Sequence, residues 1–163
     1  MSRLLIVLCL SLLVAGCGFK PRASLAVASS LGPVAVSTAD PYSPLGQDLA
    51  TALERAGATP AVAGQPAATL QVMTESMRTR PLTYESGASV REYQTLYRVE
   101  FQLTGADRTL QVPRQTVELT REYTYDAVGS IGTPAEERLL QEELRRDMVA
   151  AILRRLDAAL RAD

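Results

Sequence analysis

The sequence predicts an α+β fold, a mostly antiparallel four-stranded sheet with two helices packed on one face, in the order β-α-β-β-β-α. Two patterns carry this prediction. Residues 93–103 alternate between two kinds of side chain, as a strand with one covered face does. Residues 140–160 repeat a large apolar side chain in steps of four, as an amphipathic helix does. The length of 163 residues suits one domain.

The first strand and the first helix are predicted from short signals between residues 33 and 67. Residues 34–36 are apolar and lie between two turn-forming pairs, so they are predicted to form a short strand. Ser43 and Pro44 then begin a helix, because serine caps a helix N-terminus and proline suits its first turn. Gly57 is the predicted end, and residues 58–67 are expected to form a connection. The apolar face of this helix is Leu45, Leu49, Ala52, Leu53 and Ala56.

Three further strands are predicted between residues 68 and 125. In the second strand, apolar residues occupy even positions from Ala68 to Val72, and Pro81 interrupts the pattern before a predicted hairpin turn at residues 85–88. In the fourth strand, the apolar positions change from even to odd numbers around Pro113, which predicts a β-bulge or an edge strand. The third strand shows the clearest alternation, with one face formed by Tyr93, Thr95, Tyr97, Val99, Phe101 and Leu103.

The last element is predicted to be a long helix. Residues 133–136 form a capping box with proline at the first helical position. Its apolar stripe is Leu140, Leu144, Met148, Ile152, Leu156 and Leu160. With both helices on one face of the sheet, the other face is expected to be comparatively polar.

No catalytic or metal-binding arrangement is predicted. The chain has no histidine, which is the commonest general base and transition-metal ligand. The acidic pairs at 136–137 and 142–143 are adjacent on a helix, so their carboxylates point about 100° apart and do not converge. With 17 basic and 18 acidic residues, the chain is not a bulk electrostatic binder of nucleic acid. We therefore expect no enzyme activity, no cofactor, no metal and no nucleic-acid partner.

Residues 1–16 are predicted to be a lipoprotein signal peptide. As a helix, the apolar run 4–14 would be about 16 Å long, which is roughly half of a bilayer core, so it predicts a signal and not a membrane span. The small residues before Cys17 resemble a bacterial lipobox, in which the cysteine receives lipid and becomes the acylated N-terminus. Gly18, in place of aspartate, favours the outer membrane. The alternative is a plain secretory signal followed by an unrelated cysteine.

Residues 17–163 are predicted to form a single periplasmic domain, with 17–24 as its lipidated leash. Cys9, the only other cysteine of the chain, lies in the predicted signal peptide. The mature chain is therefore expected to contain no free thiol and no disulfide.

Arginine and tyrosine stand out in the predicted strands. Sixteen of the 17 basic residues are arginine, and Arg forms bidentate contacts with phosphate and carboxylate where Lys cannot. Ordinary solvated arginines and core tyrosines are the simplest interpretation, and a partner surface is the alternative. The residues concerned are Arg78, Arg80, Arg91, Arg98, Arg114, Arg121, Tyr84, Tyr93, Tyr97, Tyr123 and Tyr125.

Four short motifs, in this order along the chain, resemble the lipopolysaccharide-assembly lipoprotein LptE family. Residues 15–19 are similar to the start of the mature family proteins, where an aromatic residue follows Cys-Gly. Residues 92–94 (Glu-Tyr-Gln) open the long alternating strand, and 121–126 resemble the Arg-aromatic-Asp end of the fourth strand. Residues 136–156 resemble the closing helix. The similarity runs over nearly the whole chain.

The resemblance implies a function without catalysis. Proteins of this family act as plug and assembly partner inside the lumen of an outer-membrane β-barrel, LptD, and the complex inserts lipopolysaccharide into the outer leaflet. The resemblance therefore implies three partners: an LptD-type barrel, lipopolysaccharide, and the outer membrane through acyl chains on Cys17. Tyr93, Arg121 and Tyr125 are the candidate residues for the barrel interface.

The family's basic residues in two loops have no counterpart here. The matching places, 85–87 and 132–134, carry no positive charge. Arg78, Arg80 and Arg91 lie nearby and are the candidate lipopolysaccharide-binding residues. Two other functions stay open at this point. One is a free periplasmic lipid- or glycan-binding lipoprotein, which needs an apolar cavity between sheet and helices. The other is a cofactor-free hydrolase.

Overall fold

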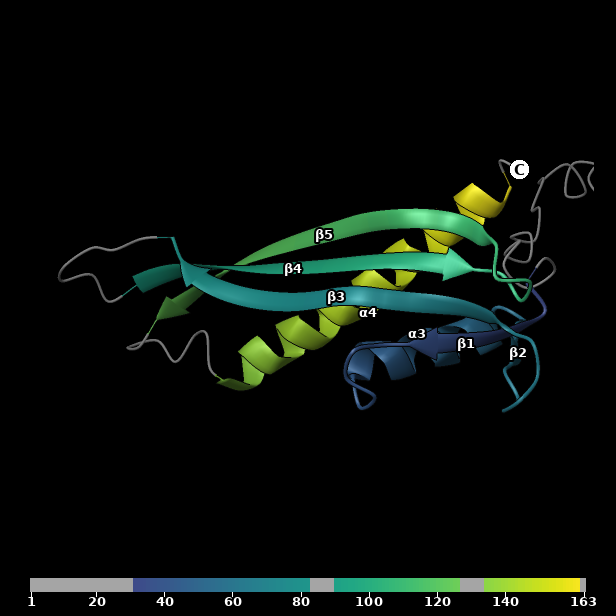
Figure 1. Cartoon of the computed structure of the whole chain (residues 1–163). Helices are drawn as coiled ribbons and strands as arrows, with labels where there is room; N and C mark the ends of the chain where they lie inside the picture. The colour runs from purple at the N-terminus through teal and green to yellow at the C-terminus, as the bar shows by residue number, and fades with distance from the viewer. Residues whose placement is uncertain (1–30, 83–89, 127–133, 162–163) are drawn as a thin grey trace, which may run out of the picture.

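The computed structural model of this chain describes residues 31–82, 90–126 and 134–161, and in these it forms a five-stranded sheet and two helices (Figure 1). The helices are α3 (Pro44–Arg55) and α4 (Pro134–Leu160). The order of the strands across the sheet is β2-β1-β3-β4-β5. The strands are β1 (Pro33–Ser37), β2 (Thr59–Pro60), β3 (Ala68–Pro81), β4 (Val90–Thr104) and β5 (Leu110–Asp126).

The structure confirms the α+β class with two helices, but the sheet has five strands and not the predicted four, and it is mixed. β1 is parallel to both of its neighbours, whereas β3, β4 and β5 pair antiparallel, so the sheet is mixed. The unpredicted strand, β2, consists of two residues, which pair with Pro33 and Val34 of β1. A strand of two residues that includes a proline shows no apolar alternation, so the sequence pattern carries no signal for it.

The sheet has two ends that matter for function. We call the end at which β1, β3 and β5 begin the proximal end. The opposite end, where Pro81, Val90 and Asp126 lie, is the distal end. β1 is short, so it pairs with β3 only over the proximal residues 68–71. The distal half of the sheet is therefore formed by β3, β4 and β5 alone.

α3 forms where it was predicted, because both of its ends are capped. The hydroxyl of Ser43 accepts a hydrogen bond from the backbone N–H of Gly46 at 3.4 Å, and Pro44 occupies the first position. At the other end, Gly57 adopts a φ of 99°, a left-handed conformation that suits glycine. The leucines of α3 that pack on the sheet are buried: Leu45, Leu49 and Leu53.

α4 lies on the same face of the sheet as α3, and both helices share one core with it (Figure 1). Its 27 residues span about 40 Å. α4 runs antiparallel to β5, so its first turns lie near the distal end and its last turns near the proximal end (Figure 1). The predicted stripe is confirmed in Leu144, Met148, Ile152 and Leu156, which are buried. Thr133, the predicted cap, lies outside the described residues.

β4 and β5 confirm the sequence pattern in detail. On β4, the side chains at Thr95, Tyr97, Val99, Phe101 and Leu103 are fully buried against the helices. On β5, Val112 lies opposite Leu103 but Gln115 lies opposite Phe101, so an extra residue is inserted near Pro113. β5 is also the last strand in the sheet. The change of apolar phase therefore marks both a bulge and an edge strand.

A second irregularity, in β3, was not predicted. Val72 lies opposite Phe101 and Thr74 lies opposite Glu100, which leaves Met73 as an extra residue. A bulge of one residue exchanges the two faces of the strand beyond it. Consequently, odd-numbered residues of the distal half of β3 face the helices, and even-numbered residues face away from them.

Candidate functional site

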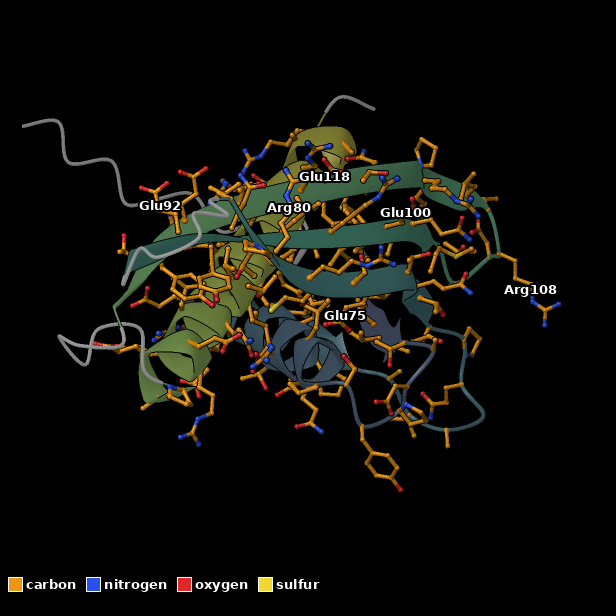
Figure 2. The ribbon with its side chains drawn as sticks, turned by 90° about the vertical axis from the view of Figure 1, so that its left-hand side faces the viewer. Glu75, Arg80, Glu92, Glu100, Arg108 and Glu118 are labelled. Carbon is orange, nitrogen blue, oxygen red and sulfur yellow. The ribbon has the colours of Figure 1, made fainter. Side chains whose placement is uncertain are left out.

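The side of β3, β4 and β5 that faces away from the helices carries mostly polar side chains, and we call it the open face. Figure 2 shows Glu75 on the side of α3, away from Arg80 and Glu118. The rows across the open face follow from the strand register. Its central residues are Arg78, Arg80, Gln94, Leu96, Arg98, Glu100, Glu118, Thr120 and Glu122.

Arg80 is part of a hydrogen-bonded row that crosses three strands. Its Nε and Nη2 donate to Oε1 of Gln94 at 3.1 and 2.8 Å. The amide nitrogen of Gln94 donates to Oε1 of Glu122 at 3.0 Å. A guanidinium carries five N–H donors, so Arg80 retains donors for an anion while it stays in the row.

Arg98 differs from Arg80, because its charge is balanced by two carboxylates. Nη2 of Arg98 lies 2.7 Å from Oε1 of Glu100, and Nη1 lies 3.2 Å from Oε1 of Glu118. The hydrogen bond to Glu100 is the main reason that the pKa of Arg98 is raised. This arginine is therefore a poor candidate for an added anion.

Arg78 differs from Arg80 and Arg98 because its side chain has no partner among the described residues. It is exposed, and no other described residue forms a hydrogen bond or ion pair with its side chain. Its register partner on β4 is Leu96, which is 37% exposed. An uncompensated guanidinium beside an exposed leucine suits a ligand that is both anionic and apolar.

The candidate interface residues Tyr93 and Arg121 lie on the other side of the sheet, toward α4. The ring of Tyr93 stacks on Tyr123 with a centroid distance of 5.4 Å. Burial, followed by the charge of Glu137, raises the pKa of Tyr123. Arg121 forms an ion pair with Asp147 of α4 at 2.8 Å, and both side chains are about half exposed, at 50% and 52%. The predicted site residues therefore divide into two groups on opposite faces.

For the remaining predicted site residues, the structure gives the backbone position of two and does not describe the others. Arg91 and Tyr125 lie opposite each other in the ladder at the distal end. Cys17 and the loop segments 85–87 and 132–133 lie outside the described residues.

Glu75 is a residue that the sequence analysis missed. Its Oε1 accepts a hydrogen bond from the hydroxyl of Tyr97 at 2.7 Å, and its Oε2 accepts one from Ser43 at 2.8 Å. Ser43 is the cap of α3, so Glu75 joins β3, β4 and α3 at one point. Burial first, and then the hydrogen bond to Glu75, raise the pKa of Tyr97. One signal was present: the apolar positions of β3 change from even at Val72 to odd at Met77.

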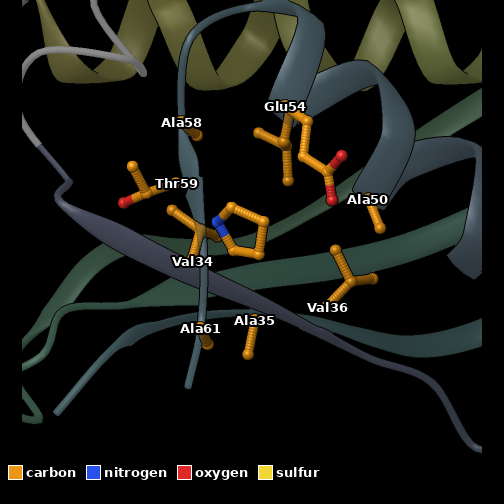
Figure 3. Close-up of a pocket in the computed structure, with 10 residues that line it drawn as sticks. Val34, Ala35, Val36, Ala50, Glu54, Ala58, Thr59 and Ala61 are labelled. Atoms are coloured by element: carbon orange, nitrogen blue, oxygen red, sulfur yellow. The ribbon is translucent and has the colours of Figure 1, made fainter. Parts of the chain in front are cut away.

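In the described part of the chain, buried apolar side chains of the sheet and both helices form one core cluster. Figure 3 shows a groove of about 250 Å³ between β1, β2 and α3, lined by Val34, Val36, Ala50 and Ala58, with Glu54 beside them. Ligand pockets usually have volumes of about 300–1,000 Å³. A larger groove of about 520 Å³ lies at the proximal end between residues 64–67 and 104–108, outside the core.

The described residues offer no cluster of three or more acidic or cysteine side chains that could hold a metal ion. Within the same part of the chain, no helix combines the length and apolarity that crossing a membrane would require.

A family model described as LptE, lipopolysaccharide-assembly, matches residues 31–156. This match includes every strand, α3 and all of α4 except its last four residues. No curated protein matches the chain.

Three solved structures are similar to this fold. A solution NMR structure of an uncharacterized lipoprotein B from Nitrosomonas europaea is 25% identical, with a TM-score of 0.71 over 86% of this chain and 91% of that chain. The crystal structure of the rare lipoprotein B from Shewanella oneidensis is 22% identical, with a TM-score of 0.63 over 78% and 95%. A minor lipoprotein from Acinetobacter baumannii is 20% identical, with a TM-score of 0.63 over 77% and 90%.

Proposed function

Because this chain belongs to the LptE family of lipopolysaccharide-assembly proteins, we propose that it is an outer-membrane lipoprotein that acts as plug and assembly partner of an LptD-type β-barrel. In this function it contributes to the transport of lipopolysaccharide and its insertion into the outer leaflet. The family match over residues 31–156 is the observation that carries the proposal. The family is not enzymatic, and we propose the same of this chain.

The anchor of the proposed lipoprotein is Cys17. Cleavage after residue 16 would leave this cysteine at the N-terminus, where the lipobox residues predict acylation. Residues 17–163 would then form one periplasmic domain behind the leash 17–24. Several buried acyl chains hold a protein to a membrane much more firmly than one, because each buried CH₂ contributes about 0.8 kcal/mol.

We assign the open face to the wall of the barrel lumen, with lipopolysaccharide bound at Arg78 between this face and the wall. The interior of a large outer-membrane barrel is polar, and the open face presents polar rows such as Arg80–Gln94–Glu122. These groups hydrogen-bond to one another, so a polar wall can cover them without leaving bare charges. Arg121, at the edge strand and half exposed, together with Tyr93 and Tyr125, extends the proposed contact around that edge.

Arg78 is the residue that we propose as the main contact for lipopolysaccharide, supported by Arg80 and Arg91. Lipid A combines phosphates with acyl chains. Arg78 offers an uncompensated cation, and the neighbouring Leu96 offers exposed apolar surface. Charge-assisted hydrogen bonds to phosphate are roughly twice as strong as neutral ones.

The barrel partnership is tested by affinity purification from detergent-solubilised outer membranes. A tagged, acylated chain is expected to recover one high-mass β-barrel in stoichiometric amount, identified by mass spectrometry. Recovery of the acylated chain without any barrel would contradict the proposal and favour a free periplasmic lipid- or glycan-binding lipoprotein.

The lipopolysaccharide site is tested separately, by measuring the affinity of the purified protein for lipopolysaccharide. The triple variant Arg78→Ala, Arg80→Ala, Arg91→Ala is expected to bind about tenfold more weakly or worse, since hydrogen bonds to charged groups contribute about 1.5–3 kcal/mol. A matched triple variant removes three exposed arginines of the helices and is expected to bind like the parent: Arg55→Ala, Arg138→Ala and Arg146→Ala. Equal affinities of both triple variants would remove the assignment.

A further inference from the structure

The proximal end of the molecule carries an excess of positive charge. Four exposed arginines gather there, from the β4–β5 turn, the start of β5 and the last turns of α4: Arg108, Arg114, Arg154 and Arg155. No other described residue pairs with their side chains. These segments also hold two acidic residues, fewer than their arginines, so the local charge stays positive. Asp107 accepts hydrogen bonds from the backbone and hydroxyl of Thr109 at 3.0 and 2.7 Å, which lower its pKa. Asp157 pairs with Arg161 at 3.0 Å.

The β4–β5 turn presents its arginine at a conformational cost. Arg108 has a φ of 67°, a left-handed conformation that glycine adopts freely and arginine does not. The turn is closed by a 2.9 Å hydrogen bond from the N–H of Arg108 to the carbonyl of Gly105. The side chain of Arg108 projects beyond the end of the sheet (Figure 2). An arginine in this position is therefore displayed to the surroundings.

Apolar side chains accompany these arginines. Leu110, two residues after Arg108, is 58% exposed. Val62, in the loop that leads from β2 to β3 at the same end, is also 58% exposed (Figure 1). Cations mixed with exposed aliphatic side chains are typical of surfaces that lie on an anionic membrane.

The predicted anchor is connected to the folded domain at its proximal end. The described chain begins at Leu31, immediately before β1, and β1 begins at the proximal end. Only 13 residues separate Leu31 from Cys17, so an extended chain spans at most about 50 Å. A lipid anchor on Cys17 therefore lies within about 50 Å of the proximal end.

We propose that the proximal end rests on the anionic surface of the membrane that holds the acyl chains. Arg108 and Arg114 contact lipid phosphates, and Leu110 and Val62 enter the headgroup region. This inference rests on the proposed acylation of Cys17. It goes beyond the proposed function, because it assigns a lipid contact to the folded domain itself.

The test uses the acylated mature protein in vesicles of phosphatidylethanolamine and phosphatidylglycerol. With Cys17 lipidated, the single introduced cysteine of an Ala106→Cys variant carries the only thiol, and a nitroxide label is attached to it. We expect the label to be protected from a water-soluble nickel chelate. A label at Thr120→Cys, in the distal half of the open face, is expected to remain accessible to the chelate.

Arg108→Ala, combined with Ala106→Cys, is expected to lower the ratio of docked to undocked protein about fivefold. The variant lacks one cation that the anionic membrane surface would attract. Arg146→Ala removes an exposed arginine from the distal half of α4 and is expected to change nothing. Equal accessibility at positions 106 and 120 in an acylated sample would overturn this inference alone. An unmodified Cys17 in the mass spectrum of the same sample would overturn the proposed anchor, and the inference with it.

Discussion

The two faces of β4 place neighbouring residues in opposite environments. Phe101 is fully buried against the helices, whereas Gln102, the next residue, donates a hydrogen bond to Gln71 of β3 on the open face at 3.0 Å. On the helix-facing side, buried apolar side chains stabilise the fold. On the open face, polar side chains form hydrogen bonds that water or a partner can replace. Stability and recognition are therefore expected to reside on different faces of the same strands. Substitutions of adjacent residues can separate the two.

The largest effect is expected from Phe101→Ala. Removing a buried phenylalanine leaves a cavity and should lower the free energy of unfolding by about 3–5 kcal/mol. Gln102→Ala is the matched control on the open face, and its loss should be about 0.5 kcal/mol or less. Urea denaturation of the purified mature chain, followed by circular dichroism, measures both. Similar losses for the two variants would contradict the division between the faces.

A smaller loss is expected from Tyr97→Phe, which removes the hydroxyl that donates to Glu75. A hydrogen bond to a charged group contributes about 1.5–3 kcal/mol. Tyr42→Phe is the control, because Tyr42 is 83% exposed. Denaturation under identical conditions should distinguish the two variants, and the idea fails if they unfold at the same urea concentration.

The same tyrosine predicts a loss of stability at alkaline pH. Burial and the hydrogen bond to Glu75 raise the pKa of Tyr97 in the folded state. A group with a raised folded-state pKa contributes stability that is fully present below its unfolded pKa, about 10, and is lost as pH rises above it. The free energy of unfolding should fall by up to about 1.4 kcal/mol per pH unit from this group. Tyr97→Phe should flatten that slope, and an unchanged slope would contradict the assignment.

The smallest effect on stability is expected from Arg121→Ala. Its ion pair with Asp147 is about half exposed on both sides, and such pairs contribute about 0.5 kcal/mol or less. The proposed contact with the barrel predicts instead a reduced yield of the barrel in affinity purification. A variant that loses stability by more than about 1 kcal/mol, while it recovers the barrel normally, would assign Arg121 to the fold and not to the interface.

The sequence predicted those elements in which the apolar and polar side chains alternate or repeat over many residues. β4 and the stripe of α4 follow from repeats over ten or more residues, and the bulge and edge position of β5 follow from its change of apolar phase around Pro113. β2 could not be predicted, because two residues have no period. The bulge at Met73 was missed because its signal, the change from even to odd apolar positions, depends on Met77 alone in the polar distal half of β3.

The candidate site was predictable by residue type but not by face. In the sequence pattern, Arg78, Arg80 and Arg121 are all arginines on predicted strands, and the pattern does not show which face each one occupies. The structure separates them, because the β3 bulge turns Arg78 and Arg80 to the open face while Arg121 pairs with Asp147 toward α4. Which arginine is already neutralised, as Arg98 is, depends on its neighbours on the next strands and not on its own strand.

The most direct test of the proposed plug is photo-crosslinking from the open face in living cells. A photoreactive amino acid at Leu96, which is partly exposed, is expected to form a covalent adduct with an outer-membrane β-barrel. The same amino acid at Tyr42, which is 83% exposed at the turn before α3, reports contacts away from the open face. A strong barrel adduct from Leu96 is the predicted result. An acylated, folded protein that gives no barrel adduct from Leu96 would contradict the assignment of the open face to the lumen wall.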